Sequence, residues 1–145
     1  VLEALDKFDE TGDIVRDFMT AFRELDFTST VHLIQPSLAR ERTILEAIER
    51  IEEYVSDMDE MAFLASKLVQ DAVCRNIEII GEASNNILRV DPAFATLNDH
   101  IPWQVMYAMR NRVSHGYDKV DFEMVWKTIH RELPTLHAQI KAVVL

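Results

Sequence analysis

Side chains that can do chemistry are concentrated in eight residues, from Arg110 to Tyr117, with the sequence RNRVSHGY. An arginine keeps its positive charge at any pH and presents a planar fork of N–H donors that suits phosphate. A histidine changes charge near neutral pH, so it can take or give a proton. Arg110 and His115 together therefore provide a cation for an anionic substrate and a group for proton transfer.

This combination is sufficient to break an RNA backbone. The 2′-hydroxyl next to each phosphodiester is itself the nucleophile, so a protein needs only to remove its proton and to stabilise the charged phosphorane. Neither step requires a metal ion or a cofactor. Arg110 and His115 are therefore the candidate catalytic residues, although a histidine at a helix end can also simply cap carbonyl oxygens and interact with the helix dipole. We expect the chain to use no cofactor and no metal.

A helix must position these groups, and their spacing determines how. Five residues of an α-helix turn the chain through about 500°, which leaves the side chains of Arg110 and His115 about 140° apart. Gly116 follows, and glycine is the usual residue just past a helix C-terminus. We therefore predict a helix that contains Arg110 and ends at His115, with Arg110, Asn111 and Ser114 on one face. The supporting side chains of this stretch are Asn111, Arg112 and Ser114.

The pattern Arg-x4-His-x-Tyr, formed by Arg110, His115 and Tyr117, resembles the motif of HEPN-domain toxins of the HepT type. A lone Arg-x4-His is common by chance, but other blocks of the chain resemble the same family in the same order. The resemblance covers residues 38–144 and leaves out residues 1–37. The further blocks are residues 45–51, 70–73, 75–83, 101–103, 120–121 and 133–134.

The resemblance implies an endoribonuclease toxin that works as a homodimer, with two motifs facing each other across a cleft. It also implies a partner, a MntA-type nucleotidyltransferase antitoxin, which would neutralise the toxin by transferring adenylate from ATP to Tyr117. ATP would then be the substrate of the partner. The alternative within the same superfamily is a catalytically silent HEPN module that binds a nucleotidyltransferase. Retention of Arg110, His115 and Tyr117 together favours the active form.

The acidic composition restricts how RNA could be bound. The 145 residues carry a formal net charge of −10, whereas general nucleic-acid binding relies on basic surface. RNA would have to be held by a local positive region around Arg110, Arg112 and Lys119. The acidic remainder either suits a basic partner protein or keeps the chain soluble.

Composition also bounds the fold class and the compartment. Apolar residues make up 48% of the chain, with only 3 Gly and 4 Pro, which favours a mostly helical globular protein. The single cysteine, Cys74, excludes an intrachain disulfide, so a reducing cytoplasm is expected. No apolar run reaches the roughly 18–20 residues of a membrane span, and we expect no membrane association.

Two segments are predicted. Residues 1–37 carry a weak helical pattern and are expected to form an N-terminal helical arm of unknown role. Residues 38–145 are expected to form a HEPN-like, all-α antiparallel bundle of four to five main helices. Ser37 would cap the first of these helices, which has an apolar seam and a charged face turned to solvent. The seam comprises Ile44, Ile48, Ile51, Val55 and Met58, and the charged face Glu41, Glu46, Glu49, Glu52 and Glu53.

A long second helix is predicted from Glu60 to Arg89, then a loop from Asp91 to His100. Gly81 costs helix stability, about 1 kcal/mol relative to alanine, so we expect it to permit a close helix crossing. A polar stripe on this helix has two open interpretations, a ladder of ion pairs or a polar wall beside the catalytic motif. The stripe consists of Asp71, Arg75, Glu78 and Glu82.

Downstream of the motif, Asp121 is expected to cap a last helix that Pro134 kinks or splits. Metal ligation is not expected, because His-Glu-x-x-His, Cys-x-x-Cys and Glu-x-x-His are all absent from the sequence. His130 and His137 share a helix face but lack a third ligand.

Overall fold

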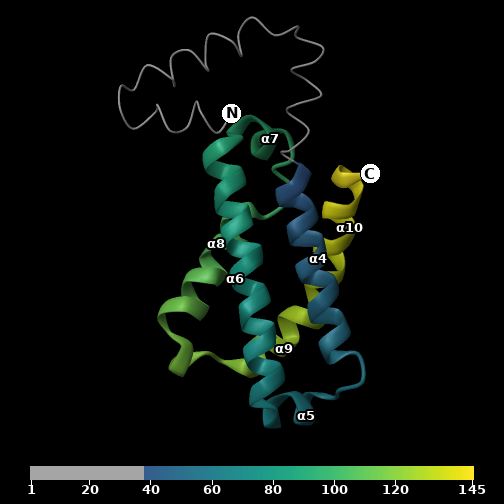
Figure 1. Cartoon of the computed structure of the whole chain (residues 1–145), viewed down its shortest axis with the longest axis vertical. Helices are drawn as coiled ribbons and strands as arrows, with labels where there is room; N and C mark the ends of the chain where they lie inside the picture. The colour runs from purple at the N-terminus through teal and green to yellow at the C-terminus, as the bar shows by residue number, and fades with distance from the viewer. Residues whose placement is uncertain (1–37) are drawn as a thin grey trace, which may run out of the picture. The chain divides into compact units, whose positions relative to one another are not determined.

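The computed structural model describes residues 38–145, except for the side chain of Tyr117. The expectations for residues 1–37, the helical arm and the cap at Ser37, lie outside the described residues. Between residues 38 and 145 every regular element is helical, which confirms the all-α class (Figure 1). The elements are α4 (Leu38–Val55), α5 (Glu60–Ala65), α6 (Lys67–Val90), α7 (Pro92–Leu97), α8 (Trp103–His115), η2 (Tyr117–Lys119), α9 (Phe122–Arg131) and α10 (Leu133–Val144).

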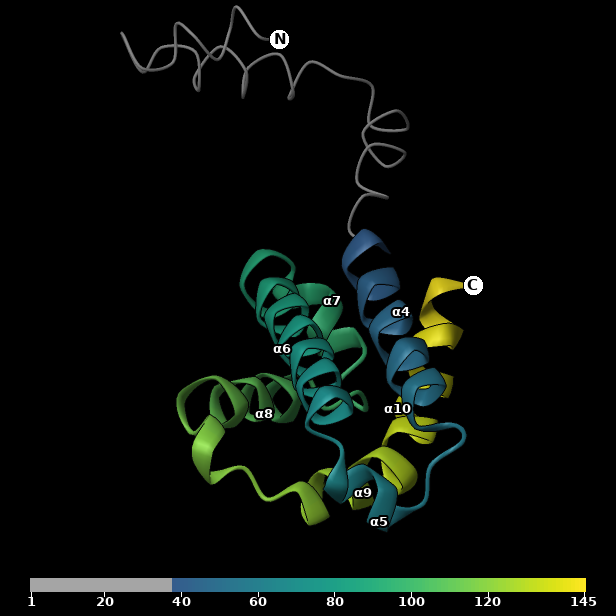
Figure 2. The same ribbon diagram turned by 60° about the horizontal axis from the view of Figure 1, so that its bottom comes forward.

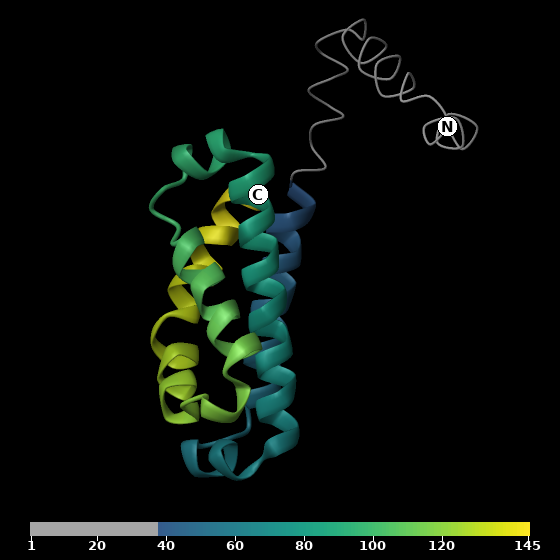
Figure 3. The same cartoon turned by 90° about the vertical axis from the view of Figure 1, so that its left-hand side faces the viewer.

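The helix α6 is central to this bundle. It packs against α4 on one side and α8 on the other (Figure 2), and α10 packs against α4. The long helices α4, α6 and α8 alternate in direction (Figure 1), and Figure 3 shows α8 running alongside α6. Within the described range five α-helices have ten residues or more, in agreement with the four to five main helices predicted.

The core lies where α4, α6, α8 and α10 meet. Ile44, Ile48 and Ile51 of the predicted seam are fully buried and Val55 is 5% exposed, whereas Met58 lies beyond the end of α4 and is only partly buried. Each fully buried aliphatic side chain stabilises the fold by about 1.5–3 kcal/mol. The same buried cluster includes Val73, Ile77, Ile80 and Ile87 of α6, Trp103, Met106 and Val113 of α8, and Leu136 and Ile140 of α10.

The prediction of one helix from Glu60 to Arg89 is wrong, because the chain breaks at Ser66 between α5 and α6. The Ser66 hydroxyl accepts a hydrogen bond from the Val69 N–H at 3.2 Å and so caps α6. The Gln70 amide donates to the carbonyl oxygens of Phe63 and Leu64, both at 3.0 Å, and thus adds hydrogen bonds at the C-terminal end of α5. The break lets Phe63 pack its ring against Trp126 of α9, with centroids 5.3 Å apart.

The predicted loop from Asp91 to His100 also contains a helix, α7. The Asp91 carboxylate accepts from the Phe94 N–H at 3.3 Å, and Pro92 occupies the first turn, where no N–H is needed. The short helix buries Ala95 and brings Phe94 to 6.0 Å from the ring of Trp103. Asp91-Pro92 ends α6 as predicted, but the residues that follow form a short helix that packs against α6 and Trp103.

The signals that end helices are confirmed. Gly116 follows the last residue of α8, and its N–H donates to the Arg112 carbonyl oxygen. Asp121 caps α9 by accepting from the Met124 N–H at 3.2 Å. Pro134 lies in the first turn of α10, so the predicted last helix is split at Glu132 into α9 and α10.

Glu41 contradicts the prediction that the charged face of α4 is turned to solvent. Its side chain is 1% exposed, and its Oε2 has no hydrogen-bond partner within the described part of the chain. Burial raises the pKa of this carboxyl group, since the charged form is disfavoured away from water. The other glutamates of that face keep at least part of their surface in water.

Candidate functional site

The motif helix α8 crosses α6 at Gly81. A Cβ atom at this position would overlap the Cβ of Arg110 and would come within 2.9 Å of the Met106 carbonyl oxygen. Only glycine therefore allows the two backbones to approach this closely. The close crossing predicted for Gly81 is confirmed, and it is the contact that sets Arg110 against α6.

The guanidinium of Arg110 is held by two neighbours. Its Nη2 lies 3.5 Å from Oε2 of Glu82 on α6, and its Nη1 donates to Oδ1 of Asn111 at 3.0 Å. The Arg110 side chain is 30% exposed, so part of the guanidinium faces solvent and can reach an anion. An ion pair this exposed adds little stability, about 0–1 kcal/mol; its main consequence is to fix the direction of the guanidinium.

The polar stripe of α6 combines both interpretations that the sequence leaves open. Arg75 and Glu78 form an ion pair along the helix, with Nη1 and Oε2 3.6 Å apart, as expected for a ladder. Glu82 instead contacts the motif through Arg110. Asp71 is exposed at the far end of the stripe, and it is not among the residues that line the hollow around Arg110.

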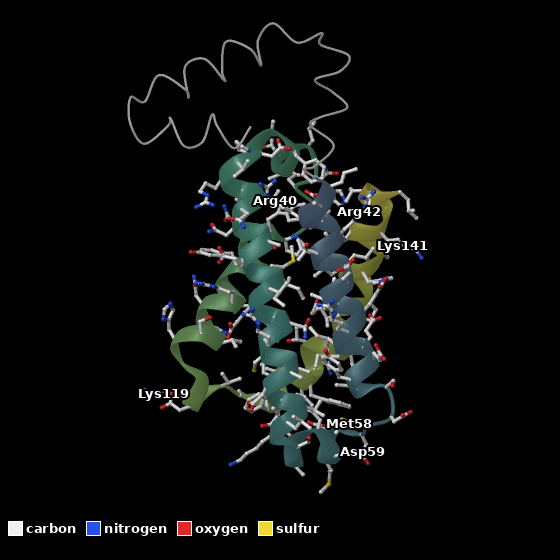
Figure 4. The ribbon with its side chains drawn as sticks, in the orientation of Figure 1. Arg40, Arg42, Met58, Asp59, Lys119 and Lys141 are labelled. Carbon is white, nitrogen blue, oxygen red and sulfur yellow. The ribbon has the colours of Figure 1, made fainter. Side chains whose placement is uncertain are left out.

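Arg110 lines a groove of about 400 Å³ between α4, α6 and α8. We call it the arginine groove, because three arginines line it together with Glu78 and Glu82. Arg40 is the member that sequence reasoning does not find, since it lies outside the motif and outside the blocks of family resemblance. Figure 4 shows it on the side of α4 that faces α6. The three arginines are Arg40, Arg75 and Arg110.

His115 lies elsewhere on the surface of the chain. It is exposed at the last position of α8 and lines a second hollow, also of about 400 Å³, between the end of α8, η2 and the start of α9. Asn111, Arg112 and Lys119 line this hollow as well, but Arg110 does not. Because α8 includes both residues, the helical spacing places the two catalytic candidates on different faces. Asn111 connects them, because it binds Arg110 and also lines the His115 hollow.

Two further predicted site residues are placed less centrally. Ser114 lies four residues after Arg110 on α8, so the two share a helix face, but Ser114 is exposed and lines neither of these hollows. The backbone of Tyr117 begins η2, directly after Gly116. The orientation of its phenol lies outside the described residues, and its proposed modification stays a prediction.

Other titratable groups are occupied by structural contacts. The His130 ring stacks on Trp126 with centroids 4.0 Å apart, and His137 Nε2 lies 3.1 Å from Oε1 of Glu49. Cys74 is buried, and burial, with Asp71 and Glu78 nearby, raises the pKa of its thiol to about 11, so it is a poor nucleophile. Among residues 38–145 no three His, Cys, Asp or Glu side chains gather closely enough to hold a metal ion.

None of the helices in the described range is both long and apolar enough to cross a bilayer.

Comparison with known families places this geometry in context. The sequence profile of the HepT-like ribonucleases matches residues 44–143. The chain belongs to the HepT-like ribonuclease family. This match includes the whole motif and the close crossing at Gly81, and it confirms the family resemblance noted from the motif. Membership supports ribonuclease activity.

Individual relatives agree with this assignment. A protein of Thermococcus cleftensis with the name probable ribonuclease HepT is 42% identical over 98 residues, which is 68% of this chain and 86% of that protein. A Methanocaldococcus jannaschii protein, named for a γ-glutamylcyclotransferase and a candidate RNase, is 42% identical over 97 residues, or 67% of this chain. The matched region spans only 42% of that second protein. No solved structure matches the chain.

Proposed function

We propose that this HepT-like protein is a metal-independent endoribonuclease toxin that cleaves RNA by attack of the 2′-hydroxyl. The observation that carries the proposal is the placement of Arg110. A guanidinium fixed by Glu82 and Asn111, yet partly open to solvent, is suited to bind a phosphate. His115 at the exposed end of the same helix supplies the proton-transfer group.

The chemistry needs a base and an acid. One neutral His115 removes the proton of the 2′-hydroxyl, whose oxygen attacks the adjacent phosphorus and forms the phosphorane. Arg110 stabilises the added negative charge. A protonated His115 then donates its proton to the 5′-oxygen as the P–O5′ bond breaks. The products are a 2′,3′-cyclic phosphate and a free 5′-hydroxyl, and neither water nor any other molecule is consumed.

This proposal is tested by incubating the purified protein with total cellular RNA, with and without EDTA. We expect equal cleavage under both conditions and fragments that end in a 2′,3′-cyclic phosphate. Cleavage that EDTA abolishes and Mg²⁺ restores would contradict the mechanism. RNA binding without any cleavage would instead favour the silent HEPN module.

A homodimer is proposed because one chain divides the catalytic groups between two hollows. Two copies could place Arg110 and His115 of both chains around one cleft, which would supply the acid, the base and two phosphate clamps. We expect sedimentation equilibrium to show a dimer at micromolar concentration, with Arg110 and Glu82 at or near the interface. A monomer with full RNase activity would contradict this arrangement.

Neutralisation is proposed to occur at Tyr117. A MntA-type nucleotidyltransferase would join the phenol oxygen to the α-phosphate of ATP and release pyrophosphate. An anionic adenylate two residues from His115 would then compete with RNA for the cationic site. The wild type, incubated with a cognate nucleotidyltransferase and ATP, is expected to gain adenylate mass on the peptide that carries Tyr117 and to lose activity.

The matched variant is Tyr117→Phe, which keeps the ring and removes only the hydroxyl. We expect it to retain most RNase activity and to resist the antitoxin. Neutralisation of this variant to the same extent as the wild type would rule out Tyr117 as the modified residue.

A further inference from the structure

The arginine groove extends well beyond Arg110. Its α6 wall runs from Arg75 to Asn86, which corresponds to about 16 Å along the helix axis at 1.5 Å per residue. One strand of a nucleic acid carries a phosphate about every 3.4 Å of a duplex axis, so a wall of this length exceeds what one phosphate occupies. The groove is therefore long enough to contact more than one backbone phosphate next to Arg110.

The charges of the groove differ from those of the whole chain. Three arginines and two glutamates line it, which gives a net charge of +1 (3 − 2), whereas the complete chain carries −10. Both glutamates already lie near arginines, Glu78 near Arg75 and Glu82 near Arg110. In a strongly acidic protein, a positive groove that contains Arg110 is a surface to which a polyanion can bind, and unlike the His115 hollow it contains the guanidinium proposed to act in catalysis.

The ion pairs in the groove are weak enough to be exchanged. The Arg75–Glu78 distance is 3.6 Å and the Arg75 side chain is 71% exposed, so the pair is well screened by water. A phosphate presents more charge and more acceptor oxygens to an arginine than a carboxylate that is held off at this distance. Arg75 can therefore turn from Glu78 to a phosphate at little cost.

Polar and apolar neighbours complete the groove. Asn86 lies at the end of the wall, where its Oδ1 accepts from Arg89 Nη2 at 2.8 Å. Its amide nitrogen is then its remaining donor, and a phosphate oxygen can accept from it. Thr43 of α4 adds a hydroxyl, and Ile79 and Ala83 provide an apolar floor. Such a floor suits the carbon atoms of ribose.

We infer that the arginine groove binds the backbone phosphates of the RNA strand beside the cleaved bond, with Arg40 and Arg75 as phosphate ligands. This inference rests on the proposed ribonuclease function. Arg40 and Arg75 do not touch the reacting phosphate; they hold the strand so that its scissile bond reaches Arg110. They act on substrate affinity, whereas Arg110 acts on the chemical step.

The inference is tested by measuring RNA binding without cleavage, so that the result does not depend on catalysis. The probe is a fluorescent single-stranded RNA of about 12 nucleotides with a 2′-O-methyl group at every ribose. This RNA keeps its phosphates but has lost the nucleophile, so it cannot be cleaved. Binding of the 145-residue chain is measured over a series of salt concentrations.

The logarithm of the binding constant falls linearly with the logarithm of the salt concentration. Each lost phosphate contact makes this slope less steep by about 0.7 for a single strand. We expect this change for Arg40→Gln and for Arg75→Gln. At 0.1 M salt it corresponds to a roughly 5-fold weaker affinity. Glu78→Gln should have the opposite effect and bind the RNA more tightly, because it removes the carboxylate that competes with phosphate for Arg75.

The control variants remove one arginine or one glutamate outside the groove, so they change the net charge by the same amount as the groove variants. Arg42 lies two residues from Arg40 on α4, about 200° around the helix, and Figure 4 shows it on the side away from α6. Glu46 is an exposed residue of the same helix. Arg42→Gln and Glu46→Gln should leave the slope and the affinity unchanged. Thermal unfolding of each variant shows that the fold is retained.

The outcomes are distinct. Wild-type slopes for Arg40→Gln and Arg75→Gln would overturn the inference, and so would equal losses for Arg42→Gln, since net charge alone would then explain binding. Absence of binding to the 2′-O-methyl RNA would also overturn it. If the groove variants behave as expected but unmodified RNA is never cleaved, the proposed function fails and the RNA-binding groove stands.

Discussion

The His115→Ala variant is expected to cleave RNA roughly 10²–10⁴ times more slowly than the wild type, which is the usual contribution of a general acid or base. His115 is exposed and ends α8, so few packing contacts are lost. A histidine at a helix C-terminus adds at most about 0.3–1 kcal/mol through the helix dipole. The loss should therefore appear in kcat and leave the melting temperature nearly unchanged.

A matched control is His100→Ala. His100 is also exposed, but it lies before α8 and belongs to a different surface. The His100→Ala variant should cleave RNA at the wild-type rate. If His115→Ala is folded and equally active, His115 is neither the acid nor the base, and the proposed mechanism is lost.

The Arg110→Ala variant is expected to lower the rate of cleavage by about 10²–10³, by analogy with the loss of one oxyanion donor. Alanine keeps the Cβ atom that packs at Gly81, so the crossing of α6 and α8 is retained. What is lost is the guanidinium that Glu82 and Asn111 orient. The effect should lie in kcat, in contrast to the effects of Arg40→Gln and Arg75→Gln on binding.

Arg110→Lys distinguishes charge from geometry. Lysine keeps the positive charge but cannot form two parallel N–H contacts with a phosphate. We expect it to restore only part of the lost rate. Full activity in Arg110→Lys would show that a point charge is enough, and full activity in a folded Arg110→Ala protein would exclude Arg110 from the chemistry.

The sequence determined those features that depend on neighbouring residues. Gly116, Asp121 and Pro134 predicted helix boundaries correctly because each acts on the backbone within one turn. The seam of α4 was predictable because burial follows helical periodicity. The order of the motif residues was likewise visible, and so was the roughly 140° that a continuous helix places between Arg110 and His115.

The tertiary structure decided the rest, because contacts between distant segments are not encoded in local patterns. Phe63 packs on α9 and Gln70 satisfies the carbonyls of α5, and this makes a break at Ser66 where the apolar pattern continues. Glu41 has the charge of a surface residue but is covered by its surroundings. Its spacing along α4 does not reveal this burial.

The candidate site also depends on contacts between segments that are far apart in the sequence. Gly81 could be recognised as a crossing point, but only the packing of α6 on α8 shows that Arg110 fills the space of its missing side chain. That crossing brings Arg110 to Glu82, and the packing of α4 on α6 adds Arg40 from 70 residues earlier in the chain. Residues so far apart in sequence share a groove only because the helices that carry them bury their apolar faces against one another.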